Sequence, residues 1–177
     1  MIRKDARRAI KEFFFTHPSE KLRVREIERK LDLSLPSVIE QCKRLEKEGI
    51  LAKVEIGSVF FYTAARTNRK YILEKKLFNI RRLYESGLVD YLKEELHNPT
   101  ILLFGSYSRG EDTEESDIDL YLETSSKKTP ELHSFEAKLK RKIHIFKHKN
   151  IHEIKNPHLA NNIINGITLN GYIEVFK

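Results

Sequence analysis

This sequence of 177 residues has one cysteine, no long hydrophobic run and no excess of acidic residues. The single cysteine, Cys42, excludes an intramolecular disulfide framework and a cysteine-rich zinc site. No apolar run approaches the roughly 20 residues of a membrane-spanning helix. The first residues, MIRKDARRAIKEF, are charged and helically periodic, unlike a signal peptide. These absences predict a cytoplasmic protein with no membrane partner.

Positive charge is unevenly distributed along the chain, whose formal net charge is +7. Residues 1–64 contain 14 Lys and Arg against 10 Asp and Glu, and residues 65–99 contain 8 against 5. Residues 100–177 are balanced, with 11 of each. The basic first part is therefore compatible with nucleic-acid contact. Hydrophobic residues make up 40% of the chain, which is sufficient for packed cores.

The most informative stretch is residues 101–123, ILLFGSYSRGEDTEESDIDLYLE. Its first part, Ile101–Phe104, is apolar throughout, as expected of a strand that is buried on both faces. Gly105 and Ser106 then interrupt the strand where a helix is expected to begin. A glycine allows a phosphate to approach the backbone closely, and anions bind well at helix starts. The pattern therefore indicates a phosphate-binding turn.

Two aspartates begin a second predicted strand, Asp117–Glu123. Because side chains alternate along a strand, Asp117 and Asp119 share one face while Ile118 and Leu120 lie on the other. Two carboxylates separated by about 7 Å, at ~3.3 Å per residue, can share a Mg²⁺ ion. The sequence thus predicts a magnesium site at Asp117 and Asp119. The alternative is an acidic hairpin loop capped by serine and aspartate, without a catalytic role.

This stretch resembles the signature of the DNA polymerase β superfamily of nucleotidyltransferases, which is Gly-Ser followed by Asp-x-Asp. It is most similar to the minimal nucleotidyltransferases of prokaryotes. The residues that carry the resemblance are Gly105, Ser106, Arg109, Gly110, Glu111, Ser116, Asp117, Ile118 and Asp119. The resemblance implies transfer of a nucleoside monophosphate from ATP or another NTP to a hydroxyl of a protein or RNA. Relatives of this kind include antitoxins that adenylylate a partner toxin.

The resemblance also implies roles for individual residues. Gly105 and Ser106 would lie under the nucleotide phosphates, and Asp117 and Asp119 would hold Mg²⁺ that bridges those phosphates. Arg109 would contact a phosphate, with an ion pair to a neighbouring acidic residue, Glu111 or Asp112, as an equally weighted alternative.

One position departs from the superfamily pattern. Its members normally have a third carboxylate on the strand that follows the next helix, where it helps to deprotonate the attacking hydroxyl and completes the metal site. The strand expected over Lys142–Phe146 offers His144 at that position. Imidazole accepts a proton near neutral pH, but Mg²⁺ prefers oxygen ligands. His144 is therefore a catalytic candidate and also a reason to expect weakened catalysis.

Residues 1–64 show a pattern of three helices and a hairpin. Helices are predicted over Asp5–Thr16, over Arg25–Leu31 and from Ser34 to about Glu48, followed by strands at Ile50–Glu55 and Val59–Thr63. This order resembles a winged helix-turn-helix, whose third helix usually enters the DNA major groove. Gly49 is expected to end the third helix in a left-handed conformation, and Cys42 is expected in the core.

Six residues of this part are candidates for contact with duplex DNA. Base-edge contacts are predicted for Ser37, Gln41 and Arg44, and phosphate contacts for Lys43, Lys47 and Lys53. Glutamates on the same helix face would repel DNA, so binding to a protein, or dimerisation, is the alternative.

The predicted fold class is α+β, with a winged helix-turn-helix over residues 1–64, a helical connector over 65–98 and a nucleotidyltransferase domain over 99–177. In this last domain Pro130–Lys140 and Pro157–Ile164 have helical spacing, and Asn162–Val175 is interpreted as the final helix and the chain end. We expect a mixed sheet of three or four strands with helices on one side.

Three functions are compatible with these patterns. The first is an active Mg²⁺-dependent nucleotidyltransferase coupled to a DNA-binding domain. The second is a DNA-binding transcriptional regulator whose weakened nucleotidyltransferase domain senses nucleotide. The third is an interaction module that serves oligomerisation, for example as a homodimer.

Overall fold

The computed structural model describes residues 5–176, which form two compact units. The units comprise residues 1–78 and 79–177, so the division falls inside helix α4 (Arg69–Glu85) and within the predicted connector. The predicted domain limits at residues 64 and 98 stay predictions. Of the helices formed by residues 5–176, none has the length and apolar character needed to cross a membrane.

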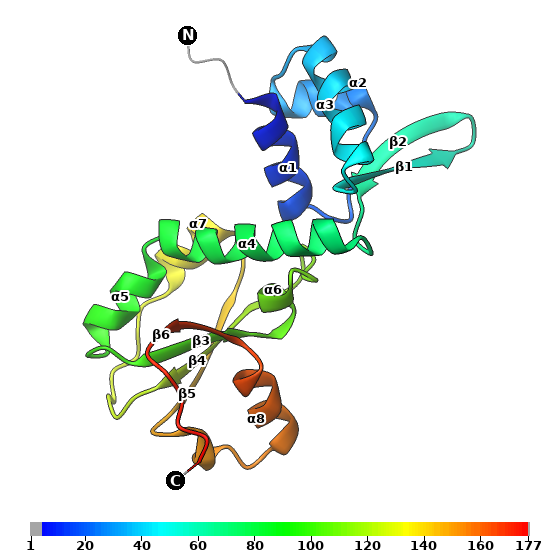
Figure 1. The fold of residues 1–177 in the computed structure, drawn as a ribbon. Coiled ribbons are helices and arrows are strands. Elements are labelled where there is room, and N and C mark those ends of the chain that lie inside the picture. The colour runs from blue at the N-terminus through cyan, green and yellow to red at the C-terminus, as the bar shows by residue number, and fades with distance from the viewer. Residues whose placement is uncertain (1–4, 177) are drawn as a thin grey trace. The chain divides into compact units, whose positions relative to one another are not determined.

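Three helices and a hairpin make up most of the first unit (Figure 1), with the bounds α1 (Ala6–Thr16), α2 (Val24–Leu31), α3 (Leu35–Lys47), β1 (Leu51–Ile56) and β2 (Val59–Ala64). Helix α1 begins after Asp5, whose side chain accepts a hydrogen bond from the backbone N–H of Arg8. After α3, Gly49 adopts a φ of +76°, which confirms its predicted role. The winged-helix assignment itself stays a prediction.

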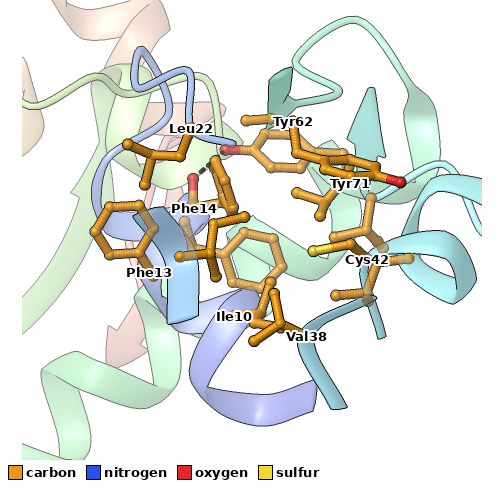
Figure 2. Packing of buried hydrophobic residues seen from close by; sticks show 14 residues of the cluster. Ile10, Phe13, Phe14, Leu22, Val38, Cys42, Tyr62 and Tyr71 are labelled. Carbon is orange, nitrogen blue, oxygen red and sulfur yellow. Dashed lines mark hydrogen bonds between the residues drawn. The ribbon is translucent and has the colours of Figure 1, made fainter. Parts of the chain in front are cut away.

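The core of the first unit joins the apolar faces of α1 and α3 to the hairpin. Figure 2 shows Ile10 and Phe14 of α1 packed with Val38 and Cys42 of α3. The hydroxyl of Tyr71 donates a hydrogen bond of 3.0 Å to the backbone oxygen of Phe14. Cys42 is fully buried, and this burial, followed by the charge of a nearby glutamate, raises the pKa of its thiol to about 12. Its predicted place in the core is confirmed.

The second unit is built on a mixed sheet of four strands in the order β5-β4-β3-β6. Strand β3 is antiparallel to β4 and β6, whereas β4 and β5 are parallel and are connected through α7. After α4 the elements are α5 (Leu88–Glu95), β3 (Thr100–Phe104), α6 (Gly105–Arg109), β4 (Ile118–Glu123), α7 (His133–Leu139), β5 (Ile143–His148), the 3₁₀ helix η1 (Ile151–Glu153), α8 (Pro157–Ile164) and β6 (Ile167–Asn170). The predicted mixed sheet is confirmed.

Helices cover both faces of this sheet, so the expectation of helices on one side is wrong. On one face, Ile101 and Leu103 of β3 are buried in a cluster that includes residues of α5 and α7. On the other face, Leu102 and Phe104 are buried with Ile163 of α8, and Figure 1 shows α8 across the sheet from α5. The reason is the uninterrupted apolar sequence of β3, because both of its faces must be removed from water.

The end of the chain also differs from the prediction. Helix α8 has the predicted bounds, but Ile167–Asn170 forms the edge strand β6 where a final helix was expected. Gly166 lies between the two elements, and a Cβ added there would lie 2.6 Å from the backbone oxygen of Leu103. A glycine at this position therefore lets the chain leave α8 and pass closely along β3. Helix α7 is also shorter than predicted, since it begins at His133 rather than Pro130.

Candidate active site

Three neighbouring strands bring the predicted site residues onto one line across the sheet. Phe104, the last residue of β3, is paired with Asp119 of β4, and Asp119 is paired with His144 of β5. Gly105 directly follows Phe104, and Asp117 directly precedes the first residue of β4. Strand register thus gathers residues from three separate parts of the sequence.

His144 faces both aspartates. Its Nδ1 atom lies 3.6 Å from Oδ2 of Asp117 and 3.8 Å from Oδ1 of Asp119, so the contacts are electrostatic rather than direct hydrogen bonds. The side chain of Asp119 is 27% exposed, and those of Asp117 and His144 are more open. Burial raises the pKa of Asp119 above its ordinary value, while nearby His144 lowers it and the charge of Asp117 raises it further.

The two aspartates suit a divalent cation whose coordination is completed from outside the protein. A cation between them would stabilise the ionised form of Asp119, whose pKa is raised mainly by burial and further by the charge of Asp117. Within residues 5–176, no group of three or more His, Cys, Asp and Glu is placed to hold a metal alone. Mg²⁺ commonly takes one or two carboxylates and completes its shell with water and phosphate oxygens. Asp117 and Asp119 therefore fit Mg²⁺ together with a nucleotide.

The turn between β3 and α6 requires glycine for two reasons. Gly105 has a φ of +72°, which most other residues adopt only with strain. A Cβ at this position would also collide with Oδ2 of Asp119. Gly105 therefore lets the backbone lie directly against one of the aspartates. Ser106 follows in the first turn of α6, and the hydroxyl of Ser108 donates a hydrogen bond of 2.8 Å to the backbone oxygen of Gly105.

Arg109, at the end of α6, forms an ion pair with Glu111. Its Nε atom lies 2.7 Å from Oε2 of Glu111, and both side chains are about half exposed. The structure thus contains the ion pair that was one of the two expectations for Arg109. A phosphate contact would require this pair to open, at a cost of about 1 kcal/mol or less for an exposed pair.

Asn79 of α4 belongs to the surroundings of the site although no motif includes it. The residue is 2% exposed, and its Nδ2 atom donates to the backbone oxygen of Tyr107 at 2.9 Å and to Oδ1 of Asp112 at 2.7 Å. These bonds tie α6 and the loop after it to α4, which fixes the position of the turn at Gly105. The sequence does contain one sign of this role. Asn79 lies four positions before Leu83, which places it on the same, buried face of the helix.

Replacing Asn79 by alanine is expected to lower the free energy of unfolding by about 2–3 kcal/mol, because two hydrogen bonds between buried groups are lost. Urea denaturation followed by circular dichroism measures the change. Asn165→Ala is the matched control, since it removes one exposed hydrogen bond and should change stability by no more than about 0.5 kcal/mol. Equal stability of the Asn79→Ala and Asn165→Ala proteins would show that the two hydrogen bonds of Asn79 contribute little to the stability of the protein.

The six candidates for DNA contact lie on α3 and β1, and three of them already contact other side chains of the protein. Arg44 forms an ion pair of 2.6 Å with Glu40, and the hydroxyl of Ser37 accepts a hydrogen bond from Ser34. The Nζ atom of Lys53 lies 3.8 Å from the centre of the Phe60 ring. The remaining candidates are the partly buried Gln41 and the exposed Lys43 and Lys47.

The second unit is similar to known proteins over most of its length. Residues 87–171 match the family described as Polymerase beta, Nucleotidyltransferase, and this range contains Gly105, both aspartates and His144. The chain is also 37% identical over 79 residues to a protein of Methanocaldococcus jannaschii that carries the provisional name of a protein adenylyltransferase. That alignment covers 41% of this chain and 76% of the relative. This chain therefore belongs to the polymerase β family of nucleotidyltransferases.

Proposed function

We propose that this protein transfers a nucleoside monophosphate from Mg²⁺-bound ATP or another NTP to a hydroxyl group of a protein or RNA. The observation that carries the proposal is the line of Gly105, Asp119 and His144 across three strands, with Asp117 beside it. This line lies inside the region that matches the nucleotidyltransferase family. The name of the M. jannaschii relative adds support for adenylyl transfer.

Each residue of the line has a role in this proposal. The backbone at Gly105 and the hydroxyl of Ser106 bind phosphate oxygens, because the turn can approach a phosphate without a side chain in the way. Asp117 and Asp119 hold Mg²⁺, which when bound offsets negative charge on the phosphates. Arg109 adds positive charge at the phosphates once its exposed pair with Glu111 opens.

The reaction is a displacement at the α-phosphorus. The acceptor oxygen forms a bond to this phosphorus while the bond to the pyrophosphate oxygen breaks, and pyrophosphate leaves. The proton of the acceptor hydroxyl passes to His144, whose Nδ1 atom faces the aspartates and whose Nε2 atom is therefore the proton acceptor in this proposal. Positioning and charge neutralisation supply most of the acceleration, as in other phosphoryl-group transfers.

Transfer of label from α-³²P-ATP tests the proposal. The full chain is incubated with labelled ATP, Mg²⁺ and a mixture of cellular protein and RNA, and labelled products are separated by their sensitivity to protease and ribonuclease. The matched control is the Asp117→Ala, Asp119→Ala double variant. Label that depends on the aspartates supports an enzyme. Equal labelling by the double variant would rule out these aspartates as its catalytic centre.

Gly105→Ala is expected to weaken binding of Mg²⁺–ATP by about tenfold or more. The added Cβ collides with the Asp119 carboxylate, and the left-handed backbone costs about 1–2 kcal/mol for alanine. Isothermal titration with a non-hydrolysable ATP analogue measures the affinity. Gly87→Ala is the control, because Gly87 has a similar φ of +84° and nothing lies within 4 Å of its added Cβ. Loss of affinity in both variants would point to general destabilisation rather than to the turn.

The position of His144 favours a second candidate function. If imidazole does not complete the metal site, the second unit would bind nucleotide without catalysis, and the protein would be a nucleotide-sensing transcriptional regulator. This alternative predicts ATP binding that depends on Asp117 and Asp119, no transfer of label, and DNA affinity that changes when ATP binds.

We further propose that the first unit is a winged helix-turn-helix that binds duplex DNA. The supporting observations are the order of three helices and a hairpin, together with exposed Lys43 and Lys47 on α3. The ion pair between Arg44 and Glu40 would have to open for a base contact, so phosphate contacts from lysines would supply most of the affinity.

Replacing Lys43 and Lys47 together by alanine is expected to weaken DNA binding across all sequences. Each lost phosphate contact should reduce the slope of log affinity against log salt concentration by about one. Fluorescence anisotropy with a labelled duplex at several salt concentrations measures this slope. Lys155→Ala, which removes an exposed lysine of the second unit, should leave the slope unchanged. A wild-type slope in the double variant would exclude these lysines from the DNA interface.

A further inference from the structure

The two ring nitrogens of His144 have different surroundings. The Nδ1 atom lies 3.6 Å from a carboxylate oxygen of Asp117 and 3.8 Å from one of Asp119. The Nε2 atom makes no hydrogen bond within residues 5–176, and the side chain as a whole is 56% exposed. With the ring proton on Nδ1, where it faces the two carboxylates, Nε2 carries the lone pair. That lone pair is therefore available to a bound substrate.

The strand order places this imidazole across from the proposed phosphate turn. Phe104 of β3 is paired with Asp119 of β4, and Asp119 is paired with His144 of β5. Neighbouring strands lie about 4.8 Å apart, so Gly105, which follows Phe104, and His144 flank a space about 10 Å wide. A phosphate over Asp119 would have the turn on one side and the imidazole on the other. An in-line displacement at phosphorus needs an entering and a departing atom on opposite sides.

The cation that the two aspartates fit leaves the imidazole unused as a ligand. Mg²⁺ prefers oxygen, so a nitrogen beside Asp119 is a poor addition to its shell. Histidine is also one of the side chains that form covalent intermediates in enzymes. A carboxylate at the same position would be drawn to the metal, whereas the lone pair of His144 can approach the phosphorus.

The charges around His144 favour a bond to its Nε2 atom. A neutral imidazole that forms a bond to phosphorus becomes a cation, and its positive charge is shared by both nitrogens. That charge would lie 3.6 Å from Asp117 and 3.8 Å from Asp119, and the side chain of Asp119 is only 27% exposed. Partial burial reduces screening by water, so the two carboxylates stabilise the product of the attack. They also hold the ring in place, as a carboxylate orients the histidine of a catalytic triad.

We propose that His144 itself takes the nucleoside monophosphate when no acceptor hydroxyl is bound. The lone pair of Nε2 forms a bond to the α-phosphorus, and the bond from this phosphorus to the pyrophosphate oxygen breaks. Pyrophosphate leaves with that electron pair, and Nδ1 keeps its proton beside the aspartates. In the reverse step an oxygen of pyrophosphate displaces the imidazole and regenerates the NTP.

This self-modification rests on the proposed nucleotidyl transfer and adds a second reaction of the same nitrogen. An acceptor hydroxyl that enters from the β5 side lies between Nε2 and the phosphorus. Nε2 then takes the proton of the hydroxyl, as in the direct transfer. Without an acceptor nothing separates the two atoms, and the nucleotidyl group is retained on the protein.

Labelling of the chain without any acceptor tests this inference. The full chain is incubated with Mg²⁺ and α-³²P-ATP, denatured, and separated by gel electrophoresis. We expect label on the chain that is lost in mild acid and kept in alkali, because a phosphorus–nitrogen bond is acid-labile. A phosphodiester on serine, threonine or tyrosine would withstand the same acid. Mass spectrometry of peptides kept at alkaline pH should place the adduct on His144.

Pyrophosphate exchange measures the reverse step. The chain with Mg²⁺, unlabelled ATP and ³²P-pyrophosphate should produce labelled ATP in the absence of an acceptor. His144→Ala should lose both this exchange and the acid-labile label. Because the side chain is exposed, the variant should keep the melting temperature and the Mg²⁺–ATP affinity of the unmodified protein. His158→Ala, which also removes an exposed histidine, is the control and should retain both activities.

The outcomes separate this inference from the proposed function. Label in a protein or RNA acceptor, with no label on the chain and no exchange, would overturn the adduct and leave nucleotidyl transfer standing. Release of AMP from ATP without labelling of the chain would also overturn the adduct, because water would then take the place of the imidazole. Acid-stable label on the chain, or acid-labile label that persists in His144→Ala, would exclude His144 as its site. No label on the chain or in any acceptor, with Mg²⁺–ATP binding intact, would overturn the proposed transfer and the adduct together.

Discussion

Asp119→Asn is expected to reduce nucleotidyl transfer by about 10³-fold or more while the fold remains intact. Asparagine has nearly the same shape as aspartate, but it lacks the charge that would hold Mg²⁺ against the phosphates, a contribution of several kcal/mol to the transition state. The measurement is the initial rate of label transfer from α-³²P-ATP at saturating Mg²⁺. Asp117→Asn is expected to act in the same direction.

A measurement of stability distinguishes loss of the metal site in Asp119→Asn from partial unfolding of the variant. Burial and the neighbouring Asp117 both raise the pKa of Asp119, so the carboxylate is a source of electrostatic strain when no cation is present. A neutral asparagine should therefore leave the melting temperature unchanged or slightly higher in the absence of Mg²⁺. Added Mg²⁺ should raise the melting temperature of the unmodified protein more than that of the variant.

Asp90→Asn supplies the matched control for the change from carboxylate to amide. Asp90 lies on the exposed side of α5 and contacts only Lys93, at 3.7 Å, among the ion pairs found in residues 5–176. Its replacement should alter neither the transfer rate nor the response to Mg²⁺. A transfer rate within about threefold of normal in both Asp117→Asn and Asp119→Asn would remove the metal site from the proposal.

The strands that carry the site residues could be predicted from local patterns, whereas the place of His144 beside the two aspartates was expected from the resemblance to the nucleotidyltransferases. An apolar run that ends just before Gly105 and an alternating strand that begins at Asp117 define two strand ends. The helix after the second of these strands leads to a third strand, which carries His144. The strand register then follows from which side chains are apolar, since a shift by one residue would turn Asp119 into the core. Periodicity and termination signals were sufficient for these elements.

Other parts depend on contacts between residues far apart in sequence. Strand β6 is short and carries no strong alternating pattern, and its conformation follows from pairing with β3. The covering of both sheet faces was implied by the apolar run of β3, but which helix covers each face is decided by tertiary packing. The role of Asn79 depends on its hydrogen bonds to Tyr107 and Asp112, which lie about 30 residues further along the chain and therefore outside any local pattern.

His144 decides between the two leading functions, and two substitutions at this position have opposite expected effects. His144→Ala should lower kcat by about 10²- to 10⁴-fold, the usual contribution of a positioned proton acceptor, with little change in the KM for ATP. His144→Asp places a carboxylate opposite Asp119. It should retain transfer and increase the affinity for Mg²⁺, because oxygen is the ligand that this ion prefers. Single-turnover rates and Mg²⁺ titrations measure both effects.

The exposed His158 provides the control, since His158→Ala should change neither kcat nor Mg²⁺ affinity. If His144→Ala transfers label at the normal rate, His144 is not the proton acceptor, and the two aspartates alone support the chemistry. If the unmodified protein is inactive and His144→Asp transfers label, imidazole has disabled an otherwise complete centre. The nucleotide-sensing regulator would then be the better account, because one side chain would separate nucleotide binding from catalysis.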